Sequence, residues 1–108
     1  MALKKSEIKP PVLPRETHEV PELGGEIVVR GLLLRERLAL FDDANNGGER
    51  FGHLSAVLAA CVIDAEDKPV YTIDEWERFG ALHFEAALRL FGIAQRLSGL
   101  DVEERKKN

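Results

Sequence analysis

The stretch from about Leu82 to Leu97 constrains the fold most, because its helical spacing leaves only a narrow polar side. That polar stripe consists of Glu85, Arg89, Gly92 and Arg96. The apolar residues on the rest of the circumference are Phe84, Ala86, Ala87, Leu88, Leu90, Phe91, Ile93, Ala94 and Leu97. A helix that is apolar over most of its circumference needs cover on several sides. It is therefore either the central core helix of a small body, the interpretation we favour, or a helix that a partner protein partly covers.

A shorter helix is predicted just before it, and local signals mark its start. Thr72 and Glu75 have the spacing of a capping box, and Tyr71 and Trp76 have the spacing of a hydrophobic staple. Gly80 predicts a break or bend between this helix and the next. The residues that share the apolar side of the short helix are Ile73, Trp76 and Phe79. The Ser98-Gly99 pair predicts the end of the last helix.

A β-hairpin is predicted over THEVPELGGEIVVRGL, because two short runs flank the Gly24-Gly25 pair. Such a pair suits the positive φ angles of a tight two-residue turn. Pro21 confines the first arm to a sheet edge. The two faces of the second arm carry Ile27 with Val29 and Val28 with Arg30. Isolated two-stranded ribbons are marginal in water, so we expect the hairpin to pack on helices or to pair with strands of another subunit.

Two further helices are predicted between the hairpin and Thr72. The first spans 33–43 and would turn Leu34, Leu38 and Phe41 inward, opposite Arg35, Glu36 and Arg37, before a stop at Asn45, Asn46, Gly47 and Gly48. The second runs from about Glu49 to Ile63, with an apolar face of Phe51, Leu54, Leu58, Cys61 and Val62. Residues 64–70 read as a polar loop. The predicted class is α+β, predominantly α-helical, with an N-terminal β-hairpin followed by about four helices.

The length of 108 residues fits one domain and is too short for two independent cores. Residues 1–15 are predicted to form a disordered or extended arm, because Pro10, Pro11 and Pro14 remove backbone donors and restrict their neighbours. We expect the domain to cover 16–100 and a charged tail to cover 101–108.

Charge and hydropathy exclude several kinds of partner. The net charge of −4, without a basic stripe, has the wrong sign for a nucleic-acid binder. No apolar run is long enough to cross a membrane, and Cys61, the single cysteine, suits a reducing cytosol. We therefore expect a cytoplasmic protein that binds neither nucleic acid nor membrane.

The chain carries no recognisable catalytic, cofactor or metal motif. His18, His53 and His83 fall on separate elements without ligand spacing, so each reads as a surface or satisfied histidine. Cys61 lies on an apolar helix face, where a thiol acts as a small hydrophobe. The acidic group Asp64, Glu66 and Asp67 lacks the twelve-residue calcium pattern and reads as a solvated loop. We therefore predict no enzyme activity, no cofactor and no metal site.

Three segments form a familiar pattern when they are taken together: ETHEVPELGGEIVVRGLLLRERLAL, VYTIDEWERFG and AALRLFGIAQRLSGL. They follow the proline-containing arm and precede a charged end. As a set they resemble the small tail assembly chaperones of lambda-like siphophages and related prophages. The resemblance runs from Arg15 onward, and EVPELGGEIVVRGL and AQRLSGL carry most of it.

This resemblance implies a protein of the host bacterial cytoplasm that is absent from the mature virion. Such chaperones bind and solubilise the tape measure protein and help recruit the major tail (tube) protein. A homo-oligomer is possible, and an A-rich tract encoding Lys106-Lys107 would suit a frameshifted longer form. The candidate partner-binding residues are Val20, Val28, Trp76, Phe79, Phe84, Leu88 and Phe91. For each of them, burial in the core is the alternative that we favour.

Two other functions compete with this one. The chain is alternatively a small structural virion component, such as a connector or tail subunit. The second alternative is an unrelated non-enzymatic adaptor for protein interactions.

Overall fold

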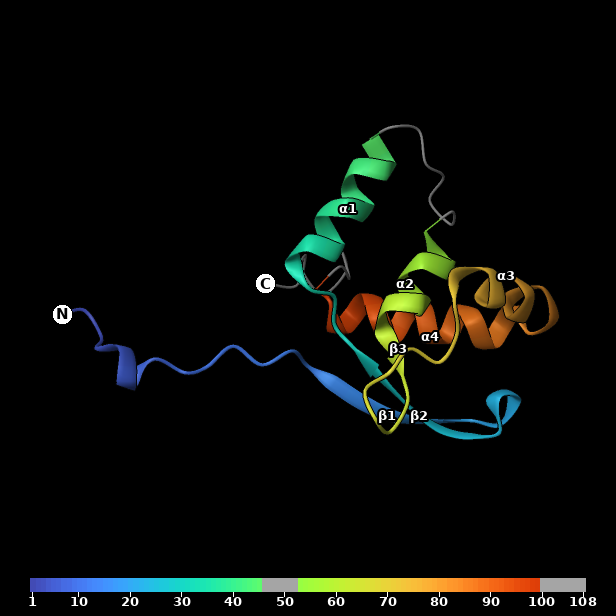
Figure 1. The fold of residues 1–108 in the computed structure, drawn as a ribbon, viewed down its shortest axis with the longest axis horizontal. Helices are drawn as coiled ribbons and strands as arrows, with labels where there is room; N and C mark the ends of the chain where they lie inside the picture. Colours follow the sequence, from blue (N-terminus) through green and yellow to red (C-terminus); the bar gives the residue numbers. More distant parts are fainter. Residues whose placement is uncertain (46–52, 100–108) are drawn as a thin grey trace.

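A β-hairpin, a short third strand and four helices make up the computed structural model, which describes residues 1–45 and 53–99 (Figure 1). The elements are a 3-10 turn at Lys5–Glu7, β1 at Arg15–Val20, a 3-10 turn at Pro21–Leu23, β2 at Gly25–Arg30, α1 at Leu34–Asn45, α2 at Leu54–Cys61, β3 at Val62–Ile63, α3 at Ile73–Leu82 and α4 at Phe84–Leu97. The predicted α+β class and the order of a hairpin followed by four helices are confirmed.

The three strands form one antiparallel sheet in the order β1-β2-β3, so β1 is an edge strand as predicted. In β2, Ile27 and Val29 are buried while Val28 and Arg30 are half-buried, which confirms the predicted alternation of its two faces. Val20 at the end of β1 adds a third buried side chain to the inner face.

The hairpin turn differs from the predicted two-residue turn. Val20 pairs with Gly25, so four residues, Pro21 to Gly24, connect the strands. Pro21 starts a 3-10 turn, and the Gly24 N–H donates to the Pro21 carbonyl at 3.0 Å. Gly24 has a φ of 96°, whereas Gly25 belongs to β2. Because proline holds its φ near −65°, Pro21 suits the first position of the 3-10 turn. In this turn Gly24 then has the positive φ that favours glycine.

The predicted second helix is wrong at its C-terminal end. α2 ends at Cys61, and Val62 and Ile63 form β3, pairing with Val29 and Val28 of β2. Two β-branched residues beside an open strand complete the sheet more readily than they extend a helix. The predicted helix start near Glu49, Phe51 on its apolar face and the Asn46–Gly48 stop lie outside the described residues, as does the charged tail at 101–108.

The loop at 64–70 and the start of α3 agree with the sequence prediction. The Asp64 carboxylate accepts hydrogen bonds from the backbone N–H groups of Glu66 and Lys68 at 2.8 and 3.1 Å. The Thr72 hydroxyl accepts from the Glu75 N–H at 3.2 Å, and the Glu75 carboxylate accepts from the Thr72 N–H at 2.9 Å. This pair is the predicted capping box.

The predicted break at Gly80 is wrong, because α3 continues through it to Leu82 and the chain changes direction at His83. A glycine inside a helix costs about 1 kcal/mol relative to alanine but does not end the helix. A Cβ at Gly80 would lie 3.8 Å from the Ala87 Cβ, so the glycine faces α4 closely. Ile73, predicted on the inner side of α3, is instead half exposed.

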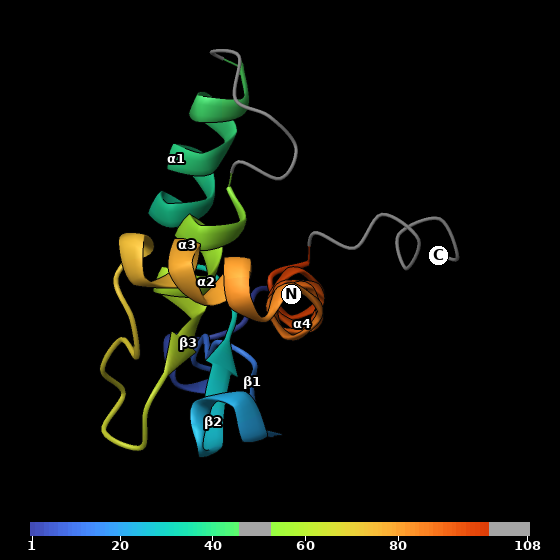
Figure 2. The same ribbon diagram turned by 90° about the vertical axis from the view of Figure 1, so that its right-hand side faces the viewer.

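The last helix is the central core helix. Figure 2 looks nearly along α4 and shows α3 beside it and the sheet below. The buried residues of α4 are Ala86, Ala87, Leu90, Phe91 and Ala94. At its C-terminal end the Leu97 carbonyl lies so close to β2 that a Cβ at Gly31 would come within 2.7 Å of the oxygen. Only glycine permits this approach. Ser98 and Gly99 end the helix as predicted, with Gly99 at a φ of 72°.

The residues before Pro14 leave the body as an extended arm (Figure 1). The Pro14 carbonyl accepts a hydrogen bond from the Gly31 N–H at 3.0 Å, which is the last backbone contact before the arm departs. The Cα radius of gyration is 15.5 Å, compared with roughly 13 Å for a compact chain of this length. The extended arm contributes to this larger radius.

An ion pair joins the edge strand β1 to the end of α4. The Arg96 guanidinium donates two hydrogen bonds to the Glu16 carboxylate, at 2.7 and 2.8 Å. His18 Nε2 lies 2.8 Å from the same carboxylate. Hydrogen bonds from Arg96 and then from His18 lower the pKa of Glu16 from 4.5 to about 2. The charged form of Glu16 is therefore favoured by folding.

This ion pair predicts an acid-dependent share of the stability. A depressed native pKa contributes stability that is fully present above pH 4.5 and is lost as the pH falls from 4.5 toward 2. We expect Glu16→Gln to lower the urea midpoint at pH 7 and to differ little from the unsubstituted chain near pH 2. Glu26→Gln, which removes an exposed carboxylate of β2, is the matched control. Equal effects of E16Q at pH 7 and pH 2 would contradict the account.

Candidate partner-binding surfaces

Most of the predicted partner-binding residues lie in the core. Val20, Trp76, Phe79 and Phe91 are buried, Val28 and Leu88 are half-buried, and only Phe84 is largely exposed, at 61%. The four buried side chains pack in one core with α4, which is the alternative that the sequence favoured for each of them. Among the seven predicted residues, only Phe84 has a largely exposed apolar side chain.

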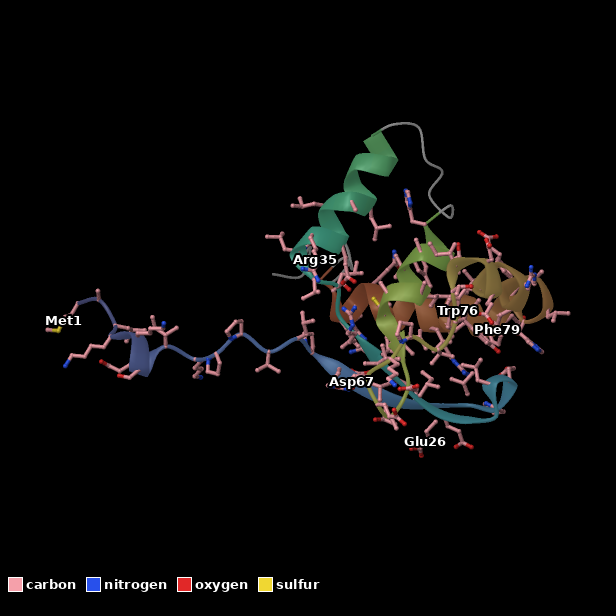
Figure 3. The ribbon with its side chains drawn as sticks, in the orientation of Figure 1. Met1, Glu26, Arg35, Asp67, Trp76 and Phe79 are labelled. Carbon is pink, nitrogen blue, oxygen red and sulfur yellow. The ribbon has the colours of Figure 1, made fainter. Side chains whose placement is uncertain are left out.

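Trp76 and Phe79, which are labelled on α3 in Figure 3, are buried in an aromatic cluster. The ring of Tyr71 meets that of Trp76 edge-on at 5.0 Å, which confirms the predicted hydrophobic staple. Trp76 and Phe79 also pack edge to face, with ring centroids 5.1 Å apart. Such pairs add about 0.5–1.5 kcal/mol beyond their buried area. The cluster therefore holds the start of α3 against the core.

A second apolar surface lies on α1, on the side predicted to face inward. Leu34 is 72% exposed and Leu38 is 54% exposed, whereas Glu36 and Arg37 are half-buried. The predicted orientation of this helix is therefore wrong. The side chain of Phe41, the third member of the predicted face, lies outside the described residues. We call the pair Leu34 and Leu38 the α1 face.

An ion pair at the start of α1 gives the physical reason for this orientation. The Arg30 guanidinium donates two hydrogen bonds of 3.1 Å to the Glu36 carboxylate, which also accepts from the Leu33 N–H at 2.8 Å. Partial burial raises the pKa of Glu36, but the hydrogen bonds from Arg30 and Leu33 outweigh it and lower the pKa below its usual value. Because Glu36 is held against β2, the opposite side of α1 turns outward.

The α1 helix projects from the body (Figure 1), and a hollow lies between its base and α2. The hollow has a volume of about 220 Å³ and is lined by Leu32, Glu36, Ala39, Leu40, Ala56 and Ala60. Small side chains from α1 and α2 therefore border a shallow apolar space between the two helices.

A third apolar surface is a groove between α2, α3 and α4, which we call the Trp76 groove. Its volume is about 240 Å³, and its lining residues are Leu54, Ser55, Trp76, Glu77, Gly80, Ala81, Phe84 and Ala87. The Ser55 hydroxyl donates to the Glu77 carboxylate at 2.9 Å across the groove. Small-molecule pockets usually measure roughly 300–1,000 Å³, so this space suits one or two side chains of a partner.

The Trp76 side chain is fully buried and carries an unpaired polar atom. Its Nε1 is enclosed and has no hydrogen-bond partner among the described residues, and His53 Nε2 is in the same situation at the start of α2. Leaving a buried donor unpaired costs roughly 1–3 kcal/mol.

Within 1–45 and 53–99, no three histidine, cysteine or acidic side chains gather closely enough to hold a metal ion. His18 contacts Glu16, whereas His83 stacks near Phe79 at 5.2 Å. None of the helices in the same ranges is long and apolar enough to span a membrane.

Comparisons with known proteins find a similar fold but no matching family model or curated sequence. No family model and no curated protein sequence matches the chain. Among solved structures, it is similar to the tail assembly chaperone of bacteriophage HK97, with a TM-score of 0.58 and 21% sequence identity. The match covers 85% of this chain and 88% of the HK97 chain. The chain has the fold of a phage tail assembly chaperone.

The tail assembly chaperone fold accounts for nearly the whole chain. Because the match spans most of both proteins, the hairpin and the helical half belong to one shared architecture. At 21% identity the likeness concerns the arrangement of elements and not individual side chains.

The single cysteine, Cys61, provides a test of whether the core is closed to solvent. Burial raises the pKa of the Cys61 thiol to about 11. At pH 8 only roughly one thiol in a thousand would then be in the reactive thiolate form. We expect Ellman's reagent to label Cys61 slowly in the native protein and rapidly in the same protein unfolded with urea. Fast, complete labelling of the native protein would contradict the buried, unreactive thiol.

Proposed function

We propose that the chain is a phage tail assembly chaperone, a non-enzymatic protein that binds the tape measure protein and keeps it soluble. It then helps recruit the major tail (tube) protein. The observation that carries the proposal is the shared fold with the HK97 tail assembly chaperone over 85% of this chain. In this function the protein acts in the host bacterial cytoplasm and is absent from the finished particle.

Keeping the tape measure protein soluble until the tube forms favours many weak contacts over one strong contact. A long helical protein that has not yet been enclosed by the tail tube exposes apolar stripes, and exposed apolar patches promote aggregation. Many copies of a small protein can cover such stripes through contacts that are individually modest. The net charge of −4 helps to keep the covered rod soluble. Each copy must leave when tube subunits arrive, so a limited affinity is an advantage.

The α1 face is the surface that we assign to the tape measure protein. Leu34 and Leu38 lie one helical turn apart on the outward side of a projecting helix. A partner helix can pack its apolar side against such an exposed pair. Burying one leucine stabilises a complex by about 1.5–3 kcal/mol at most. Two leucines therefore give the modest affinity that the task requires.

This assignment predicts the effect of charges on the α1 face. We expect Leu34→Glu or Leu38→Glu to weaken binding to the tape measure protein of the same phage about tenfold or more, because each removes roughly 1.4 kcal/mol or more of apolar burial. In co-expression, the tape measure protein should move from the soluble to the insoluble fraction. Ile73→Glu is the matched control, since Ile73 is a comparably exposed aliphatic residue on α3.

Circular dichroism should show unchanged helix content in all three variants, because the substituted side chains are at least half exposed. If L34E and L38E solubilise the tape measure protein as well as I73E does, the α1 face is not the contact surface.

Particle composition tests the function itself against its main rival. Mass spectrometry of purified phage particles should detect the tube and tape measure proteins but not this chain. A stoichiometric amount of the chain in washed particles would identify it as a structural virion component instead.

A further inference from the structure

Strand β1 leaves one side of the sheet open. The strand order is β1-β2-β3, so no other strand of the described residues pairs with the outer edge of β1. The Gly31 N–H donates to the Pro14 carbonyl at 3.0 Å, which makes these two residues a hydrogen-bonded pair. Hydrogen-bonded and non-hydrogen-bonded pairs alternate along antiparallel strands. In the observed register, the N–H and C=O groups of Arg15, Thr17 and Glu19 therefore point toward the open edge.

The side chains on the outer face of the hairpin carry charges that their own sheet does not match. Glu19 lies opposite Glu26, both are exposed, and neither has an ion-pair partner among the described residues. Figure 3 shows Glu26 on the side of the sheet that faces away from the helices. At the other end Arg15 lies opposite Arg30. Arg15 contacts Asp67, yet half of the Arg15 side chain stays exposed. Because like charges directly opposite each other are unfavourable, a strand that brings the opposite charges would be favoured at this edge.

A second copy of β1 brings these charges in the required order. When two copies pair antiparallel about Thr17, Arg15 of each copy lies opposite Glu19 of the other. These are the positions whose main-chain groups face the open edge, so the two strands can form about six hydrogen bonds. Opposite charges and paired threonines are both favourable across strands. On the helix side, the same register places Glu16 opposite His18 of the second copy, an acceptor opposite a possible donor.

Two prolines limit the pairing to this register. Pro14 would lie opposite Val20 of the second copy at a non-hydrogen-bonded position, where its missing N–H breaks no bond. Pro21 would occupy the next hydrogen-bonded position and cannot donate there, so the pairing ends with the strand. Parallel pairing would instead bring like charges together. Charged side chains usually protect an edge strand from other strands, but here their order matches the same strand in the antiparallel direction.

We propose that two copies of this chain join through their β1 edges as a twofold-symmetric, antiparallel pair. Because both copies use the same surface, the contact is closed and yields a dimer. A dimer carries two α1 faces, and linking two weak contacts raises the overall affinity for a partner that meets both. This inference goes beyond the proposed function, because it concerns a contact between copies and uses a surface separate from the α1 face.

Two charge reversals test the register. Arg15→Glu leaves acids at both charged positions and Glu19→Arg leaves bases at both, so each variant repels a second copy of itself. In sedimentation velocity at low salt, we expect the unsubstituted chain to form a dimer and each variant alone to dimerise at least fivefold more weakly. An equimolar mixture should recover dimerisation, because every facing pair in the mixed dimer again has opposite charges.

Matched controls separate this contact from a general effect of charge. Glu26→Arg makes the same change in charge as E19R on the neighbouring strand, and Arg35→Glu makes the same change as R15E on exposed α1. Both controls should dimerise like the unsubstituted chain. Circular dichroism of all four variants checks that they are folded.

A cysteine at the twofold axis tests the geometry independently of any other contact between copies. The Cα atoms of the two Thr17 residues would lie about 5.5 Å apart, and disulfides span roughly 4.4–6.8 Å between Cα atoms. Mild oxidation of Thr17→Cys should therefore give a covalent dimer on a denaturing gel. Glu26→Cys, equally exposed but away from the edge, is the control and should stay largely monomeric. The native Cys61 is buried in both variants.

Three results would overturn the proposal. The first is an unsubstituted chain that stays monomeric at high micromolar concentration. The second is a mixture of folded R15E and E19R that dimerises no better than either variant alone. The third is T17C that forms covalent dimers no faster than E26C, because any association would then use another surface.

Discussion

Burial of α4 is the constraint on which the rest of the body depends. The helix is apolar around most of its circumference, so one sheet face cannot cover it and three elements have to meet on it: β2, α2 and α3. The close approach at Gly31 brings the end of β2 against the Leu97 carbonyl, and Gly80 and Ala87 face each other where α3 meets α4. Trp76 fills the centre of the core. Removing any one of these contacts would expose apolar area that a chain of 108 residues cannot cover elsewhere.

Because α4 occupies the core, the surfaces left for partners lie elsewhere. The α1 helix is held at its base by Arg30 and Glu36 and turns Leu34 and Leu38 outward, and the arm leaves the body at Pro14. A small body of this design keeps its own core closed and leaves separate apolar side chains exposed. The closed body has the tail assembly chaperone fold shared with the HK97 protein.

Features of the fold that depend on neighbouring residues could be predicted from the sequence. The capping box at Thr72, the staple, the edge position of β1 and the central place of α4 all follow from local spacing or helical periodicity. Strand β3 could not be predicted, because its pairing partners in β2 lie more than thirty residues away. The outward turn of α1 depends on Arg30 reaching Glu36, and apolar periodicity alone cannot show which side an ion pair will hold inward. Of the seven predicted partner-binding residues only Phe84 is largely exposed, because the sequence does not show which apolar side chains the core will enclose.

The body buries α4 by itself, and we propose that it meets the tape measure protein through α1. Hydrogen–deuterium exchange of the chain with and without the tape measure protein tests this most directly. The account predicts that α4 and β2 are already well protected in the free chain, and that the partner slows exchange mainly in α1. Fast exchange of α4 in the free chain, with protection appearing there rather than in α1 when the partner is added, would contradict it.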